Sequence, residues 1–516
     1  MYLRQLDIAS FRGIQRLSIH FKPNMVLIGE NAWGKSSLLS ALSLVLNGSD
    51  TLYQFIPQDC HISPQDPQDI TLLFCFCEQK QNEYLNKHHH LYRHLLVSHQ
   101  DGLQRLYLRV SGEKQEDRLI TNYTFLNQHG EVVVDKNSQK IAQYLIKNYP
   151  VYRFRDARLN KEKIACLPLS WQGDESLKHE FLAVGHLLQY YFLDRQHITD
   201  YEIDPTLLWE KLNSLCFRLR QDSTHYIQKQ LMVFLRSLFL QPQEQKNIKA
   251  LSPIILFEDL GSRLHPRMAS IVWELSQYLP IQRITTTNSV ELISQVNLPS
   301  ICRLVRYWDK TVAYSLNHHD ISKNDLRRLT FHIRHNRSLA LFSKMWILVE
   351  GETEVWVLSE LAKLLDINLS AEGIRIVEFA QMGLKSLIKY AQAMGIEWYV
   401  LTDGDEAGHK YAGTVRELVN DQDILTNRLT TLPRQDIEHF FYTEGFADIF
   451  VKLANWKETP HQARPMRKII QRAIQRTSKP DLAIALSNEM KRRGSSSIPL
   501  LLKRLFSKVL NLSRTQ

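Results

Sequence analysis

The sequence predicts an α/β fold in two successive parts, each containing parallel strands that are followed by helices. Three observations predict it. A short apolar strand, a glycine-rich loop and a helix follow one another within residues 24–46. A second apolar strand, residues 254–257, ends in two carboxylates, Glu258 and Asp259. From residue 345 onward strands and helices alternate, a pattern typical of a parallel sheet with functional groups at the carboxyl ends of its strands.

The first glycine-rich loop fits the pattern Gly-x4-Gly-Lys-Ser/Thr and lies between a strand, 25–28, and a helix that continues over 38–46. Glycines let backbone N–H groups surround an anion, and the start of the helix adds partial positive charge. We therefore predict ATP binding, with Lys35 at the β- and γ-phosphates and Ser36 on magnesium. The expected nucleotide contacts from this loop are Gly29, Asn31, Gly34, Lys35, Ser36 and Ser37.

Composition limits the class of protein. A chain of 516 residues with 44% hydrophobic and 23% charged residues is expected to form two or three globular domains. No apolar run approaches the roughly 18 residues that span a bilayer. The N-terminal residues lack the apolar core of a signal peptide, and the six cysteines do not have zinc-site spacing. These features predict a cytoplasmic protein with reduced cysteines and no membrane partner.

The net charge of +10 is concentrated near the C-terminus. Residues 441–516 contain 15 Lys and Arg against 5 Asp and Glu, whereas 49 of each cancel over residues 1–440. A one-sided basic segment predicts contact with a polyanion, most simply the phosphates of DNA, although a solvated basic face without a partner has the same composition. The run Lys491-Arg492-Arg493 is the most concentrated part, so we expect it to contact phosphates.

Three carboxylates follow neighbouring strands in the second part of the chain. The strand 345–349 ends at Glu350, and the strand 397–401 is followed by Asp403 and Asp405. Such groups repel one another unless a cation neutralises them, and their hard oxygens suit Mg²⁺ or Mn²⁺. We expect Glu350, Asp403 and Asp405 to be both metal ligands and catalytic residues.

The order strand, Phe11-Arg12-Gly13 turn, strand and phosphate loop resembles the opening of ABC-type ATPases of the SMC, RecF and OLD group. The strand ending at Glu258-Asp259 and the following Leu-His-Pro segment, 264–266, resemble the Walker B region of OLD-like ATPases. This resemblance implies that Glu258 holds magnesium and that Asp259 orients the attacking water. A later strand, 283–289, resembles the switch strand that contacts the γ-phosphate, with Asn288 where histidine is usual.

Two departures from these ATPases predict slow hydrolysis. The usual Walker B order is Asp-Glu, whereas this chain has Glu258-Asp259, and the shorter Asp259 would hold its water farther away. No Leu-Ser-Gly-Gly-type signature precedes residue 254, so activation by a second ATPase lobe is not predicted. ATP could therefore serve a structural or regulatory role.

The second part, with an apolar strand, Glu-Gly, a helix, a strand and Asp-x-Asp, resembles the Toprim domain. An ABC-type ATPase followed by Toprim resembles the OLD (overcoming lysogenization defect) family of nucleases. The resemblance implies that Glu354 and Glu438 are further metal ligands, that Lys479 is a basic catalytic residue, and that the protein is a homodimer or larger homo-oligomer. The resemblance also predicts the order of domains. An ATPase domain at 1–340, with a helical, dimerising insertion at about 150–250, is followed by a Toprim domain at 341–440 and a basic helical region at 441–516.

Within the ATPase part, apolar stretches at 70–77 and 103–110 predict strands of an antiparallel sheet, and 181–193 and 207–240 have helical periodicity. The predicted function is an ATP-binding, Mg²⁺- or Mn²⁺-dependent DNA endonuclease with weak ATPase activity, in phage defence or DNA repair. The alternatives are an ATP-switched DNA clamp with a non-cutting Toprim unit, a topoisomerase or primase, and a signalling ATPase with an unidentified protein partner.

Overall fold

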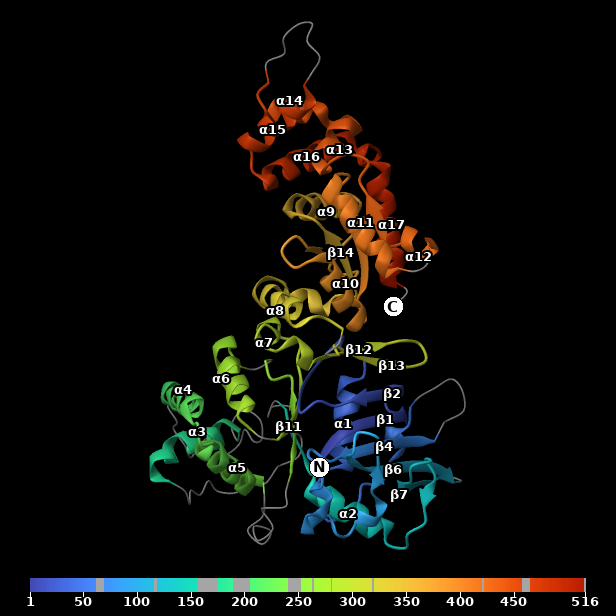
Figure 1. The fold of residues 1–516 in the computed structure, drawn as a ribbon, viewed down its shortest axis with the longest axis vertical. Coiled ribbons are helices and arrows are strands. Elements are labelled where there is room, and N and C mark those ends of the chain that lie inside the picture. The colour runs from blue at the N-terminus through green and yellow to red at the C-terminus, as the bar shows by residue number, and fades with distance from the viewer. Residues whose placement is uncertain are drawn as a thin grey trace. The chain divides into compact units, whose positions relative to one another are not determined.

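The computed structural model divides the chain into two compact units, residues 1–315 and 316–516 (Figure 1). It groups residues 316–340 with the second unit, whereas the sequence-based division at residue 340 stays a prediction. No helix in the described residues is long and apolar enough to cross a membrane. The structure describes residues 1–61, 69–115, 118–155, 174–188, 205–239, 252–261, 264–279, 281–317, 320–419, 422–456 and 465–514.

An antiparallel sheet forms one layer of the first unit, in the strand order β2-β1-β4-β6-β7-β8, with β5 paired to β6. It confirms the antiparallel sheet predicted from residues 70–77 and 103–110. The Phe-Arg-Gly turn joins the first two strands, where Arg12 adopts a left-handed φ of 48° and its Nε donates to buried Asp59 Oδ1 at 2.9 Å. The strands are β1 (Tyr2–Phe11), β2 (Ile14–His20), β4 (Ile70–Cys77), β5 (Val97–Ser98), β6 (Gln104–Gln115), β7 (Arg118–Leu126) and β8 (Val132–Val133).

The second sheet of this unit has the order β13-β12-β3-β11-β10-β9, and all its pairs are parallel except β12 with β13. Because β3, β10 and β11 are neighbours, their carboxyl ends bring the phosphate loop, the two Walker B carboxylates and the switch segment to one edge. The strands are β3 (Asn24–Ile28), β9 (Val151–Phe154), β10 (Ile254–Glu258), β11 (Gln282–Thr286), β12 (Ile301–Arg306) and β13 (Thr311–Ser315).

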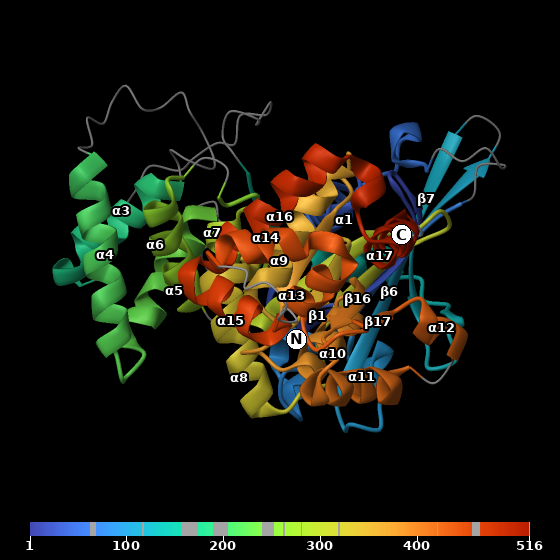
Figure 2. The ribbon, with the colours of Figure 1, turned by 90° about the horizontal axis from the view of Figure 1, so that it is seen from above.

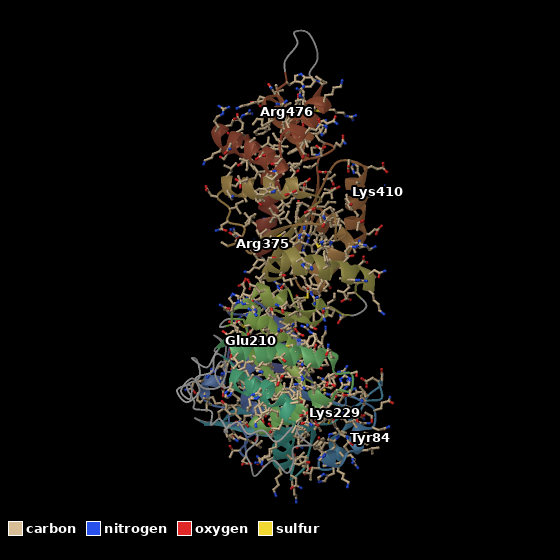
Figure 3. All side chains as sticks on the ribbon, turned by 90° about the vertical axis from the view of Figure 1, so that its left-hand side faces the viewer. Tyr84, Glu210, Lys229, Arg375, Lys410 and Arg476 are labelled. Carbon is tan, nitrogen blue, oxygen red and sulfur yellow. The ribbon has the colours of Figure 1, made fainter. Side chains whose placement is uncertain are left out.

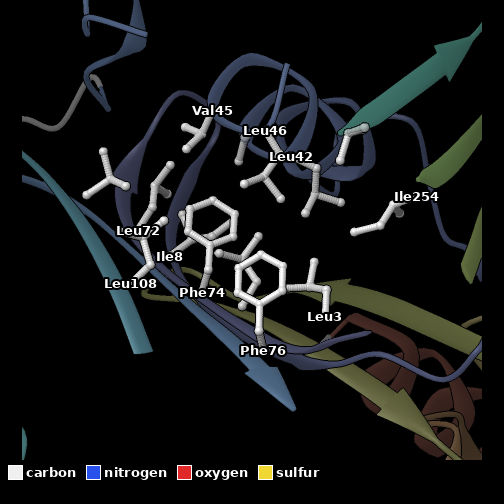
Figure 4. Close-up of a cluster of buried hydrophobic side chains, with 14 of the residues drawn as sticks. Leu3, Ile8, Leu42, Val45, Leu46, Leu72, Phe74, Phe76, Leu108 and Ile254 are labelled. Atoms are coloured by element: carbon white, nitrogen blue, oxygen red, sulfur yellow. The ribbon is translucent and has the colours of Figure 1, made fainter. Parts of the chain in front are cut away.

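Helix α1 (Lys35–Val45) packs its apolar face in one hydrophobic core with both sheets (Figure 4). Leu42 and Val45 of the helix lie among Ile8 and Phe74 of the antiparallel sheet and Ile254 of the parallel sheet. Each fully buried side chain of this size contributes roughly 1.5–3 kcal/mol to stability. The core therefore fixes α1, and with it the phosphate loop, against the sheet edge.

The helices of the first unit differ in one respect from those predicted by the sequence periodicity. The stretch 207–240 forms two helices, α4 and α5, because Asp222 ends the first and its carboxylate accepts backbone N–H groups of Tyr226, Ile227 and Gln228. Residues 189–193 and 240 of the predicted helices lie outside the described residues. The helices of this unit are α2 (Ser138–Asn148), α3 (Lys178–Leu188), α4 (Pro205–Gln221), α5 (Tyr226–Phe239), α6 (Pro266–Gln277) and α7 (Val290–Ile293).

The second unit contains a four-stranded parallel sheet in the order β15-β14-β16-β17. It confirms the predicted alternation of strands and helices from residue 345. The strands are β14 (Met345–Val349), β15 (Ile374–Glu378), β16 (Glu397–Thr402) and β17 (Leu429–Thr431), and the first helices are α8 (Lys323–His332), α9 (Glu352–Leu364), α10 (Leu384–Ala393), α11 (Glu406–Leu418) and α12 (Gln422–Thr426).

The C-terminal helices complete the second unit and confirm the helical character predicted for residues 441–516. Helix α16 lies beside α9 in both views (Figures 1 and 2), and the two share one core. This packing joins the basic region to the helix that follows Glu350. The remaining helices are α13 (Ile437–Phe441), α14 (Ala447–Leu453), α15 (Met466–Arg476), α16 (Lys479–Arg493) and α17 (Leu500–Arg514).

Candidate functional site

The phosphate loop has the backbone that its glycines require. Gly29 and Gly34 have φ values of 150° and 93°, and a Cβ on Gly29 would lie 2.8 Å from the carbonyl oxygen of Leu304. Lys35 is buried, and its Nζ donates to the carbonyl oxygens of Gly29 and, at 3.1 Å, Glu30. Burial lowers the pKa of Lys35, against the opposing charges of Asp259 and Glu30. The loop therefore holds a partly desolvated cation where an incoming anion would relieve its cost.

Hydrogen bonds connect the phosphate loop to neighbouring segments of the first unit. Lys35 Nζ also donates to Asn288 Oδ1 at 3.4 Å, and Asn288 Nδ2 donates to Asn31 Oδ1 at 3.0 Å. The switch strand thus meets the loop through Asn288. Ser37 Oγ accepts the backbone N–H of Gly13 from the Phe-Arg-Gly turn at 3.3 Å, whereas Ser36 is exposed. All of the predicted nucleotide contacts lie together at this edge of the sheet, and their role toward ATP stays a prediction.

The two Walker B carboxylates have different partners. Glu258 Oε2 accepts from both Nε (2.9 Å) and Nη2 (2.7 Å) of Arg153, whose Nη1 also donates to Ser40 Oγ of α1 at 3.3 Å. Asp259 has a left-handed φ of 52°, and its backbone N–H donates to the carbonyl oxygen of Thr286 at 3.0 Å. Burial raises the pKa of Asp259, and the charge of Lys35 opposes this rise. Asp259 is therefore the carboxylate that acts on the phosphate-loop lysine, while Arg153 offsets the charge of Glu258.

Acidic side chains of the second unit gather beside the carboxyl ends of β14 and β16. Glu350 follows β14, Asp403 follows β16, and Glu354 and Glu438 lie in the first turns of α9 and α13. Burial, together with the charges of Glu354, Glu350, Asp436 and Glu438, raises the pKa of Asp403 to about 8. Four acidic groups from three segments thus act on one carboxyl. We call these five residues, Glu350, Glu354, Asp403, Asp436 and Glu438, the carboxylate cluster.

One carboxylate oxygen of the cluster is not compensated by the described residues. Glu350 Oε2 is buried without a hydrogen-bond partner among the described residues. Burial raises the pKa of Glu350, and the charge of Asp405 adds to the rise. Burial, followed by Asp436, raises the pKa of Glu438, which is 9% exposed. A buried acceptor without a donor, among like charges, fits a divalent cation better than any group of the protein itself.

The cluster does not yet have the geometry of a bound ion. Among the described residues, no three His, Cys, Asp or Glu side chains form a group that could hold a metal ion as they stand. Mutual repulsion keeps carboxylates apart where no cation joins them. The residues present fit a divalent metal by charge and burial, and they would have to close around it.

Asp405, beside the cluster, and Asp436, within it, are the N-caps of the helices that follow them. Asp405 caps α11, where its Oδ1 accepts the backbone N–H of Gly408 at 2.7 Å, and Asp436 caps α13, where its Oδ1 accepts that of His439 at 2.7 Å. A Cβ on Gly404 would lie 2.3 Å from the carbonyl oxygen of Arg434, so the Asp-Gly-Asp segment requires its glycine. Asp436 is the cluster member that was not predicted as a ligand, although its position two residues before the predicted ligand Glu438 is a signal for it.

Lys479, the predicted basic catalytic residue, is the first residue of α16. Ser478 caps this helix in a capping box with Asp481, and the helix packs against α9, which contains Glu354. The backbone therefore places Lys479 at the start of a helix that contacts the cluster-bearing helix. The side chain of Lys479 lies outside the described part of the structure, so its role stays a prediction.

Comparisons with known proteins agree with this architecture. Residues 1–340 match the family model described as a protein of unknown function, DUF2813. Residues 341–405 match the Toprim domain of overcoming-lysogenization-defect-like proteins, a segment that contains Glu350, Glu354, Asp403 and Asp405. The chain is 38% identical over 550 residues to the uncharacterized protein YbjD of Escherichia coli K12, covering 100% of this chain and 99% of that protein.

Two solved structures each match part of the chain. The C-terminal region of the Burkholderia pseudomallei OLD protein matches 33% of this chain and 99% of that structure, at 18% identity and a TM-score of 0.29. The SMC head domain from Thermotoga maritima matches 61% of this chain and 99% of that domain, at 11% identity and a TM-score of 0.33. Because both scores are low, the assignment depends on the family models, the full-length relative and the strand orders above. The chain belongs to the DUF2813 family of YbjD-like proteins, and an OLD-like Toprim domain follows the DUF2813 region.

Proposed function

We propose that this protein is an ATP-binding, divalent-metal-dependent DNA endonuclease of the OLD type. The observation that carries the proposal is the carboxylate cluster, in which five acidic groups from four segments meet. One of its buried oxygens has no partner among the residues described, and the pKa of Asp403 is raised to about 8. Structural stability alone would favour apolar or paired residues at such positions. The cluster is best explained as a binding site for divalent cations.

Glu350, Glu354, Asp403, Asp405 and Glu438 would supply oxygen ligands. Two bound Mg²⁺ or Mn²⁺ ions would supply an activated water and shield the leaving oxygen of a phosphodiester. The protein orients these ligands: Asp405 and Asp436 fix the loops by capping α11 and α13, and the buried position of Glu438 restricts access of bulk water. Lys479 would neutralise charge on the phosphate. DNA is the proposed substrate.

The first unit would bind ATP through Gly29, Asn31, Gly34, Lys35, Ser36, Ser37 and Asn288. Ser36 is exposed at the loop and free to contact magnesium bound to the nucleotide. Asp259, which acts on Lys35, is the proposed group that orients water. For Glu258 to contact magnesium as its motif implies, it would have to leave Arg153, which is consistent with weak hydrolysis. We propose that ATP controls access to the nuclease site in a homodimer or larger assembly, in phage defence or DNA repair.

The proposal is tested by incubating the purified protein with supercoiled and linear DNA, with Mg²⁺ or Mn²⁺, and with or without ATP. We expect nicking or cleavage that requires the metal and stops in EDTA. Absence of cleavage under all of these conditions, together with ATP-dependent DNA binding, would contradict the endonuclease and favour a DNA clamp with a non-cutting Toprim domain.

A further inference from the structure

Two basic stretches of the C-terminal region have different surroundings in the second unit. In the run 491–493, Arg492 Nε donates to Glu489 Oε2 at 2.9 Å. Arg493 forms ion pairs with Glu489 (2.6 Å) and Asp448 (2.8 Å), and its guanidinium lies 4.9 Å from the ring centroid of Phe446. Two cations of this run are therefore engaged within the protein. The phosphate contacts expected there from the sequence are better sought elsewhere.

Helix α15 has the opposite character. Its sequence contains Arg467, Lys468, Arg472 and Arg476 and no acidic residue, and all four cations are exposed. None of them forms a salt bridge with another described residue, and Arg472 lies 5.8 Å from the ring centroid of Trp456. Figure 3 labels Arg476 at the C-terminal end of this helix. We call these four residues the α15 cationic face.

The other face of α15 is already used by the fold. Ile469, Ile470 and Ala473 are at most 1% exposed and belong to the core of the second unit. A basic amphipathic helix can bind a membrane only when its apolar face is available to the lipid. Because these three side chains are buried in the protein and Ile474, at 36% exposed, is the exposed large hydrophobic side chain of the helix, the free surface of α15 offers cations with too little apolar area for lipid.

The position of α15 connects it to the carboxylate cluster. The helix packs against α13, whose first turn contains Glu438, and against α14. At its C-terminal end, two residues separate Arg476 from Lys479, the proposed catalytic cation. The eleven residues of α15 extend over about 16 Å, a length along which duplex DNA presents a phosphate roughly every 1.7 Å of its axis.

We infer that the α15 cationic face binds the phosphate backbone of duplex DNA beside the carboxylate cluster. The inference deepens the proposed nuclease function and depends on it. Helix α15 contains no aromatic side chain on which a base could stack, so it contacts phosphates and is indifferent to sequence. The cations of α15 bind the phosphates of the DNA, and the carboxylate cluster is the site of hydrolysis.

The test compares two triple variants that remove the same charge. Arg467→Gln/Lys468→Gln/Arg476→Gln changes α15 but leaves Arg472, whose contact with Trp456 contributes to packing. Lys323→Gln/Arg327→Gln/Arg328→Gln changes three exposed cations of α8 in the same unit and is the control. Glutamine and these cations have similar helix propensity, so both helices are expected to persist, which thermal melting checks.

Binding of fluorescently labelled duplexes of two unrelated sequences is measured by anisotropy in EDTA, over a series of salt concentrations. We expect the α15 variant to bind both duplexes about tenfold or more weakly, with a salt slope lower by about one for each removed cation. The α8 variant should bind within about twofold of wild type. A charge-preserving variant, Arg467→Lys/Arg476→Lys, should bind as wild type does.

Unchanged binding by the α15 variant, or an equal loss in both triple variants, would overturn the inference while leaving the nuclease proposal in place. Preference of the wild type for a single strand over its duplex would also overturn it. If the wild-type protein binds and cuts no DNA, the proposed function itself fails, and this inference fails with it.

Discussion

The two candidate sites are electrostatic opposites. The site in the first unit buries a cation, Lys35, whose pKa burial lowers, and satisfies it with backbone carbonyl oxygens. The site in the second unit buries carboxylates, whose pKa values burial raises, and Glu350 Oε2 has no hydrogen-bond partner in the part of the chain that the structure describes. Each therefore carries charge that its own unit does not fully offset. A single chain thus contains one site suited to a polyphosphate anion and one suited to divalent cations.

The largest expected effect concerns the carboxylate cluster, the site proposed to bind divalent cations. Asp403→Asn or Glu350→Gln should lower the rate of metal-dependent DNA cleavage by more than about 100-fold. Each substitution removes a proposed metal ligand, and this should lower the rate more than removing a residue that only contacts a ligand. Cleavage of supercoiled DNA measures the rate. Glu406→Gln is the matched control, since this neighbour of Asp405 is 90% exposed and pairs only with Lys410 among the described residues. Cleavage that persists in both cluster variants would place the activity elsewhere.

The proposed ATP site of the first unit is tested by Lys35→Ala, which removes the buried ammonium group from the phosphate loop. Loss of two or more charge-assisted hydrogen bonds to phosphates should weaken ATP binding about 100-fold, as measured by calorimetry. The variant should still bind the metal at the carboxylate cluster. If ATP affinity is unchanged, the phosphate-loop assignment is wrong; if metal binding at the cluster is lost as well, the two sites are not independent.

The raised pKa of Asp403 predicts a dependence of stability on pH. For an acid whose pKa is raised in the folded state, here from 3.8 to about 8, the stabilisation is fully present below pH 3.8 and is lost as the pH rises through 8. In EDTA, Asp403→Asn should therefore unfold like wild type near pH 4 and be more stable by about 1–3 kcal/mol at pH 9. Urea unfolding at the two pH values measures the difference. A wild type that gains stability relative to the variant as pH rises would reverse the sign and refute the burial argument.

The smallest effect separates the two Walker B carboxylates. Asp259→Asn should lower ATP turnover about tenfold or more, because its charge acts on Lys35, whereas Glu258→Gln should change it by only about twofold, since Arg153 already offsets Glu258. Single-turnover hydrolysis of labelled ATP measures both. The reverse order of effects would mean that Glu258 leaves Arg153 to join the nucleotide site.

Features that depend on neighbouring residues in the sequence were predictable, and features that depend on distant partners were not. The phosphate loop, the strand before Glu350 and the Asp-x-Asp turn follow from glycine spacing and apolar runs. The ion pair of Glu258 with Arg153 joins residues 105 positions apart, and no local pattern indicates it. Likewise, the periodicity of 207–240 does not show the break at Asp222, which results from three backbone contacts of one carboxylate.

The basic C-terminal region shows the same limit. Its charge was correctly counted, but composition cannot tell a cation paired with an acid from a free one. Arg493 is paired because the fold brings Asp448, 45 residues earlier, to its guanidinium, whereas Arg467 and Arg476 of α15 lie exposed. Which basic side chains are exposed and which are paired with acids can therefore be seen in the folded structure but not in the sequence.

Direct titration of Mn²⁺ into nucleotide-free protein tests the central claim, that the carboxylate cluster is a divalent-metal site. The comparison uses wild type, the cluster variant Glu350→Gln/Asp403→Asn, and the matched exposed variant Glu352→Gln/Glu406→Gln, which removes the same number of carboxylates from the same loops. We predict that wild type and the exposed variant bind Mn²⁺ alike and that the cluster variant does not bind it. Equal binding by all three proteins, or an equal loss in both variants, would contradict the account.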